Sequence, residues 1–323
     1  MHPTMLDYLK SLEREGRGVT ADCYKRGLKN FQTWLDAEKL SDPLKTTKDQ
    51  LEKLQTWLAQ DYRSSTGMPL GRGTQGTRLA AVKSYYAWLH LHGLILVDPA
   101  REIRPPKVSR STVNKDHLSQ QEATALLQTQ AQYAASFKEG SEKRAVEFRN
   151  LAMLALALAT GRRRTSLISL RIKDLDFNRN EIRIEWEKGK PGRVLPCVGW
   201  AMAVAKEYVE KARVRLLNGR SDPSWLFISA EGNRVHQDCL RTAVAEAQAR
   251  AAEANPDLED LGGKRIGTHG LRVTFATLLF LNGAGIRDVN EMLMHEELST
   301  TAKYTPLELE DLRHALKLAH PRA

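Results

Sequence analysis

The sequence has few cysteines, and they are scattered. Cys23, Cys197 and Cys239 form no CxxC pair and show no Cys/His spacing typical of zinc ligands. An odd number of isolated thiols offers no disulfide framework, so we interpret all three as reduced cysteines and predict no bound metal.

Long apolar runs are also missing. The longest, Leu151–Ala159, is about half of the roughly 20 residues needed to span a bilayer, so we interpret it as a buried core helix. Residues Met1–Lys10 have neither the basic nor the apolar region of a secretory signal. The sequence therefore predicts a cytoplasmic protein with no membrane partner.

Acidic residues are outnumbered by basic ones. The 323 residues contain 49 Lys plus Arg against 39 Asp plus Glu, a net charge of +10. This balance favours a polyanionic partner such as nucleic acid, although charge alone also fits many soluble proteins. An apolar content of 41% excludes a wholly disordered chain, and the length allows two domains of ordinary size.

The first hundred residues have the apolar periodicity of helices. Spacings of three and four residues predict helices over residues 20–37, 47–59 and 77–90, with Thr20 or Asp22 as the cap of the first. We therefore expect a helical domain over residues 1–104.

The periodicity stops in a basic segment that contains several prolines. This segment predicts a linker over residues 105–118. Ser119 and Glu122 have the spacing of a helix capping box, which marks the start of a second domain over residues 119–323. Alternation over residues 181–186 and a short run over 193–198 predict a hairpin. The predicted fold class is mainly α, with a mixed α+β second domain that holds a small antiparallel sheet.

Four separated segments carry residues suited to phosphate chemistry. We name them the arginine segment (Thr160–Leu167), the hairpin segment (Glu187–Pro196), the histidine segment (Thr268–Arg272) and the tyrosine segment (Leu293–Tyr304). Each alone is a weak signal. In this order and spacing they resemble the catalytic boxes of the tyrosine recombinase, or phage integrase, family. The arginine segment resembles its TGxR box, and the histidine segment its HxxR box.

The rest of the chain shares the resemblance. The N-terminal helices and Asp98–Ala100 look like the core-binding (SAM-like) domain and linker of the family, and His320–Ala323 looks like the end of Xer-type members. The resemblance implies site-specific recombination of double-stranded DNA by a tetramer. That assembly would be a homo-tetramer, or a hetero-tetramer with a second recombinase.

Two arginines and a histidine suit a phosphate undergoing transfer. Planar guanidinium groups make paired, charge-assisted bonds to phosphate oxygens, so Arg163 and Arg272 would clamp the scissile phosphate. His269, three residues before Arg272 at the start of a helix, would donate to the same phosphate.

The resemblance assigns the remaining catalytic roles. Tyr304, nine residues after His295, would be the nucleophile that forms a 3′-phosphotyrosyl intermediate, and His295 would hydrogen-bond the phosphate. Lys188 matches the general acid of the family by its spacing from Pro196, with Lys190 as the alternative. The energy of the exchanged bond is conserved, so we expect no need for ATP. The sequence has no carboxylate cluster or nucleotide-cradling glycine loop, so we expect no metal or other cofactor.

Some residues depart from the family pattern. Ser166 stands where an acidic residue is frequent, and Met294 stands where glycine precedes the histidine. The run Arg162–Arg164 also permits a shift of one in the position of the catalytic arginine, although Gly161 and Leu167 favour Arg163. Pro306 can start a last helix with an apolar stripe, which would pack on its own domain or, from the resemblance, dock onto a neighbouring protomer.

The biological role is open at this point. Residues 129–147 and 251–264 look like insertions relative to a compact Xer protein, which favours a recombinase of a mobile genetic element. The alternatives are Xer-type resolution of chromosome or plasmid dimers, a type IB-like topoisomerase, and a DNA-binding protein without catalysis. In each case we expect a bacterial protein associated with DNA.

Overall fold

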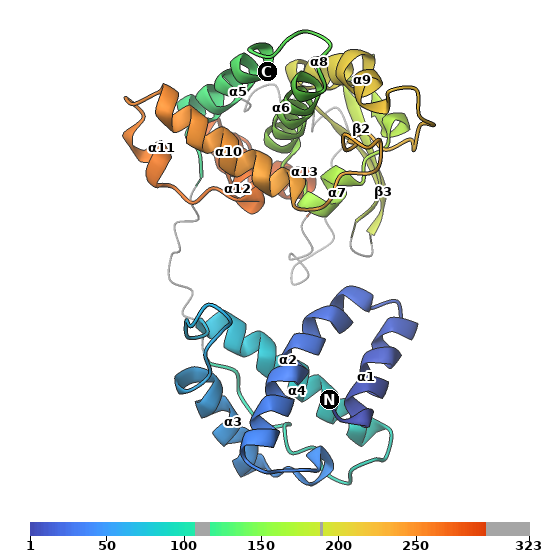
Figure 1. Ribbon diagram of the computed structural model, residues 1–323, viewed down its shortest axis with the longest axis vertical. Helices are drawn as coiled ribbons and strands as arrows, with labels where there is room; N and C mark the ends of the chain where they lie inside the picture. The colour runs from blue at the N-terminus through green and yellow to red at the C-terminus, as the bar shows by residue number, and fades with distance from the viewer. Residues whose placement is uncertain (107–116, 188–189, 295–323) are drawn as a thin grey trace. The chain divides into compact units, whose positions relative to one another are not determined.

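The structure is a computed structural model that describes residues 1–106, 117–187 and 190–294. The chain divides into two compact units, Met1–Val113 and Asn114–Ala323 (Figure 1). The described part of the first unit is helical, and the second combines helices with one three-stranded sheet. The predicted fold class is therefore confirmed. No helix within the described ranges is both long enough and apolar enough to cross a bilayer.

The first unit contains four α-helices among its described residues. They are α1 (Pro3–Arg14), α2 (Gly18–Ala37), α3 (Lys48–Gln60) and α4 (Arg72–Leu91). The three predicted helices are confirmed as α2, α3 and α4, whereas α1 was not predicted. The prediction that Thr20 or Asp22 caps α2 is wrong. The chain turns at Gly16, which has a positive φ, and α2 begins at Gly18 without a side-chain cap, so both residues lie inside the helix.

Aromatic side chains fill the core of the first unit. Tyr8, Phe31, Trp34, Tyr85 and Tyr86 are each at most 1% exposed. The hydroxyl groups of the three tyrosines find partners, because an unpaired buried hydroxyl is costly. The Tyr8 hydroxyl donates to Ser84 at 2.7 Å, and that of Tyr86 donates to the Pro43 carbonyl at 2.8 Å. These bonds join α1 and the segment before α3 to α4.

The second unit is built around one buried helix. Its α-helices are α5 (Gln120–Ala135), α6 (Glu142–Thr160), α7 (Arg164–Ile168), α8 (Gly199–Glu207), α9 (Arg213–Leu217), α10 (Cys239–Ala254), α11 (Glu259–Gly263), α12 (Thr268–Leu281) and α13 (Ile286–Leu293), with a π-helical turn at Tyr208–Ala212. Helix α6 packs against α5, α8, α10 and α12 (Figure 1). Every residue from Leu151 to Thr160 is buried, which confirms the predicted core helix.

The start of the second unit confirms the predicted capping box. The Glu122 backbone N–H donates to Ser119 Oγ at 3.2 Å, and the Ser119 N–H donates to Glu122 Oε2 at 2.6 Å. Lys264, which follows α11, donates to the same carboxylate at 2.6 Å. Burial disfavours the charged carboxylate, but the bonds from Lys264 and Ser119 outweigh it and lower the pKa of Glu122.

The sheet follows the arginine segment in the chain. It consists of β1 (Leu175–Asp176), β2 (Glu181–Glu187) and β3 (Lys190–Pro196), all antiparallel. Ile182 faces Leu195 across the β2–β3 pair, and both are buried. The predicted hairpin is confirmed, and β1 was not predicted because two residues are too few for an alternation pattern.

Candidate active site

The arginine segment begins at a sharp turn after α6. Gly161 ends the helix with φ 59°, a left-handed conformation that glycine adopts without steric cost. A Cβ atom at this position would lie 2.5 Å from Cδ1 of Phe275 and 2.8 Å from Cδ2 of Leu293. The turn therefore packs directly against α12 and α13. This close approach needs a residue without a side chain.

The three successive arginines of this segment have different surroundings. Arg162 is 3% exposed and donates to the carbonyl oxygens of Thr160 and Met292. Arg163 is half-buried at the N-cap position of α7. Arg164 reaches the segment just before α10, where it donates to Gln237 at 3.2 Å and pairs with Asp238 at 3.7 Å.

The histidine segment forms the first turns of α12. His269, the second residue of the helix, is exposed, whereas Arg272 is 4% exposed. Arg272 Nη1 donates to the Gly161 carbonyl at 2.8 Å, and Nη2 donates to the Leu293 carbonyl at 2.6 Å. Arg272 thus joins the arginine segment to the first residue of the tyrosine segment. Three of the four predicted segments meet at this side chain.

The hairpin segment is joined to the same region. Arg193 on β3 forms an ion pair with Glu291 on α13. Lys190 lies on β3 opposite Glu187 in the β2–β3 pairing. Lys188, the predicted general acid, lies outside the described residues.

The tyrosine segment is described only at its start. Helix α13 ends at Leu293, and Met294 follows with φ 51° and ψ 47°, so its backbone is left-handed. Its buried side chain belongs to the core of the second unit. A glycine at this position would adopt this conformation without steric cost. His295, Tyr304 and the predicted last helix from Pro306 lie outside the described residues.

Sequence reasoning missed two features of this region. It weighed Arg162 only as an alternative position for the catalytic arginine, because a run of three arginines carries no signal of which one is buried. It did not single out Arg193 or Glu291, since their pairing depends on the approach of α13 to the hairpin. The roles predicted for Lys188 and Tyr304 do not indicate that Arg162 is buried or that Arg193 pairs with Glu291.

Other chemistries have little support within the described ranges. No group of three His, Cys, Asp or Glu side chains among the described residues could hold a metal ion. Burial raises the pKa of Cys197 to about 12, so its thiol is protonated at neutral pH and unsuited to act as a nucleophile.

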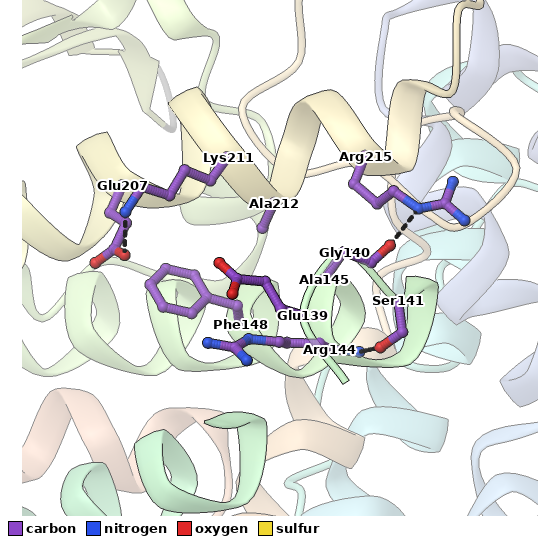
Figure 2. A pocket seen from close by; sticks show the side chains of 10 residues that line it. All are labelled: Glu139, Gly140, Ser141, Arg144, Ala145, Phe148, Glu207, Lys211, Ala212 and Arg215. Atoms are coloured by element: carbon purple, nitrogen blue, oxygen red, sulfur yellow. Dashed lines mark hydrogen bonds and ion pairs between the residues drawn. The ribbon is translucent and has the colours of Figure 1, made fainter. Parts of the chain in front are cut away.

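A pocket of about 270 Å³ lies away from these segments in the sequence, between the start of α6 and the α9 region (Figure 2). Its lining includes Glu207 and Lys211, which pair at 3.1 Å. Arg215 Nε donates to the Gly140 carbonyl at 2.7 Å. None of the residues predicted to form the site lines this pocket, so we assign it no part in the candidate site.

Comparisons with known proteins support the family resemblance of the four segments. The sequence profile described as the phage integrase family matches residues 117–310, a range that includes all four. A relative named tyrosine recombinase XerC, from Pelobacter propionicus, is 30% identical over 311 residues, which cover 96% of this chain and 92% of the relative.

Solved structures share the fold. A XerH site-specific recombinase bound to a palindromic difH substrate superposes with a TM-score of 0.63 at 18% identity, covering 94% of this chain and 78% of that one. A lambda integrase dimer bound to a COC′ core site gives 0.62 at 15% identity, covering 95% and 99%.

The protein belongs to the phage integrase family. Its relatives within that family are tyrosine recombinases, so the resemblance stated from the four segments is confirmed.

Proposed function

We propose that this protein is a site-specific DNA recombinase that cuts and rejoins duplex DNA through a covalent 3′-phosphotyrosyl intermediate. The observation that carries the proposal is the junction at Arg272, whose guanidinium bonds the Gly161 carbonyl at 2.8 Å and the Leu293 carbonyl at 2.6 Å. Segments 111 and 21 residues away in the chain are thereby held at one side chain. Membership of the phage integrase family supports the same activity.

The proposed reaction proceeds in two balanced steps. The Tyr304 oxygen attacks phosphorus and loses its proton, the bond from phosphorus to the 5′ oxygen breaks, and Lys188 gives a proton to that leaving oxygen. Attack by a 5′ hydroxyl of the partner strand reverses these events and releases the tyrosine. The number of phosphoester bonds is unchanged, so ATP is not needed.

The other proposed residues act on the charge of the phosphate. Arg163 and Arg272 would bind the non-bridging oxygens, and His269 and His295 would donate hydrogen bonds to them. A free tyrosine has a pKa near 10, so the neighbouring positive charge would also favour the phenolate of Tyr304. Lys190 is the alternative general acid.

The proposed partners are double-stranded recombination sites and further recombinase subunits. Exchange between two duplexes needs four strand cleavages, so we propose a tetramer, either of this chain alone or with a second recombinase. The relative solved structures include complexes with DNA sites, which supports DNA as the ligand. A lambda integrase with a TM-score of 0.60 was solved as a tetramer on a Holliday junction.

Two biological roles remain as candidates. The stretches 129–147 and 251–264 favour a mobile genetic element on the sequence alone, but the structure places most of their residues in α5, α6, α10 and α11. The 30% identity to a XerC protein over nearly the full chain favours resolution of chromosome or plasmid dimers. Mapping the bound sites in the native genome separates the two roles. Sites at the ends of one element support the first, and a single chromosomal site with dimer accumulation on gene deletion supports the second.

The activity itself is tested with suicide substrates. Nicked duplexes from the native genetic neighbourhood are incubated with the full chain in EDTA without ATP and resolved on a denaturing gel. We expect a covalent protein–DNA band with the wild type and with Tyr133→Phe, and no band with Tyr304→Phe. The control residue Tyr133 lies on α5 against Arg250, away from the four segments in the sequence.

The same assay separates the alternatives. Absence of a band on DNA that the wild type binds would contradict the proposed activity and favour a non-catalytic DNA-binding protein. Cleavage without preference for one site over random duplex would favour a type IB-like topoisomerase.

A further inference from the structure

The C-terminal end of α13 has all of its last carbonyl groups bonded. An α-helix leaves its last four carbonyls without partners inside the helix. In α13, the Met294 N–H donates to the carbonyls of Asn290 and Glu291. The carbonyl of Met292 accepts from Arg162, and that of Leu293 accepts from Arg272. Two arginines from elsewhere in the chain thus complete the helix end.

The two arginines come from different elements that meet at one turn. Arg162 follows Gly161 directly, and Arg272 on α12 donates to the Gly161 carbonyl at 2.8 Å. Each also bonds one of two neighbouring carbonyls of α13. The position of the helix end is therefore fixed relative to both the arginine segment and the histidine segment.

Burial of Arg162 has a cost that its contacts must offset. A guanidinium that is 3% exposed has lost most of its hydration, and charge is expensive to bury without partners. The negative end of the α13 dipole provides a favourable site for the charge, since carbonyl oxygens point toward it. An apolar side chain of similar size would fill the space but would leave the Met292 carbonyl without this donor.

We propose that Arg162 is a positioning residue for catalysis, which holds the end of α13, the helix that precedes His295 and Tyr304 in the sequence. This inference rests on the proposed function, because it concerns the placement of the proposed nucleophile. Arg162 does not touch the phosphate in this scheme. Its bond to the Met292 carbonyl holds the last turn of α13, and Met294 follows that turn with a left-handed backbone.

The test separates DNA binding from cleavage in the full chain. Arg162→Met keeps the bulk of the side chain and removes its donors. We expect its affinity for a bound site to change less than about twofold, whereas its single-turnover rate of covalent complex formation falls about 10- to 100-fold, since misplacement by about 1 Å can cost that much. Arg162→Lys retains charge and a donor and should recover part of the rate.

A matched control variant tests whether loss of any buried arginine, rather than of Arg162 in particular, slows cleavage. Arg149 on α6 is also buried, at 6% exposure, and donates to the Ile228 carbonyl at 3.0 Å. Arg149→Met should lose thermal stability and still cleave at the wild-type rate well below its Tm. If Arg162→Met does not fold, Arg162→Lys is compared with the wild type, and slower cleavage with unchanged binding is expected.

The outcomes distinguish this inference from the proposed function. Wild-type cleavage by a folded Arg162→Met, or by Arg162→Lys where only that variant folds, overturns the positioning role. Equal loss of binding and cleavage also overturns it. If the wild type binds DNA but forms no covalent complex, the proposed function is contradicted. That result comes from the wild type and Tyr304→Phe alone and does not depend on the Arg162 variants.

Discussion

Arg193 on β3 is paired with Glu291 on α13, so the strand that follows the hairpin turn is joined to the helix that precedes the proposed nucleophile. The side chains are 40% and 24% exposed, which places the pair at the edge of the second unit. Solvent screens such pairs, so its contribution to stability should be small, about 1 kcal/mol or less. The pair matters chiefly because it holds β3 and α13 next to each other.

Reversal of one charge in this pair should impair cleavage, and reversal of both should restore much of it. Glu291→Lys places two cations together and should separate β3 from α13. The double variant Arg193→Glu with Glu291→Lys restores an attractive pair. A double-mutant cycle on the cleavage rate measures the coupling. Additive effects of the two single changes would show that the pair does not link the elements.

Gly161→Ala should destabilise the second unit and prevent cleavage. The left-handed conformation costs a non-glycine residue about 1–2 kcal/mol, and the new Cβ would approach Phe275 and Leu293 closely. We expect a total loss of about 2–4 kcal/mol in the free energy of unfolding, measured by urea denaturation. Gly199→Ala is a suitable control, because a Cβ there meets only Asn180 Nδ2 at 3.7 Å. A Gly161→Ala variant as stable as this control would contradict the prediction.

Met294→Gly should be destabilising although it introduces the residue frequent in the family. Glycine removes the cost of the left-handed backbone, about 1–2 kcal/mol. It also deletes a side chain that is 4% exposed, and loss of a buried methionine side chain costs about 2–5 kcal/mol. The net expectation is a loss of about 1–3 kcal/mol in thermal or urea unfolding. A stabilised variant would show that the strain outweighs the packing.

The Glu122–Lys264 pair should make stability depend on pH in the acid range. The pKa of Glu122 is lowered in the folded state, so its contribution is complete above the unfolded value near 4.3 and is lost as the pH falls through the folded value. Glu122→Gln should cost about 1–2 kcal/mol at pH 7 and should reduce the loss of stability between pH 5 and pH 3. Urea denaturation of the full chain at several pH values measures both effects. An unchanged acid dependence in the variant would count against this role of Glu122.

Much of the fold could be predicted because it depends on local patterns. The apolar stripes of α2 and α3 and the Ser119 capping box are set by residues close in sequence. Helix α4 begins at Arg72, five residues before its predicted start, because the glycines at 73 and 76 weaken the local signal while tertiary packing retains the helix.

The candidate site could be predicted only as a set of segments. The spacing of the segments predicts roles for Arg163, His269 and Arg272, but the sequence does not tell which arginine of three enters the core. That choice is made by the approach of α13, whose Met292 carbonyl lies 130 residues from Arg162 in the chain. All six catalytic assignments remain predictions, and three of them, Lys188, His295 and Tyr304, lie outside the described residues.

The capped end of α13 has a consequence for the order of folding. Both arginines that bond its last carbonyls are synthesised before it, and domains fold progressively as the chain emerges from the ribosome. Helix α13 can complete its end only where the turn after α6 and helix α12 supply these two donors. A partly folded chain would thus lack both donors at this helix end. If the proposed positioning role holds, DNA cleavage would be confined to protein whose second unit has finished folding.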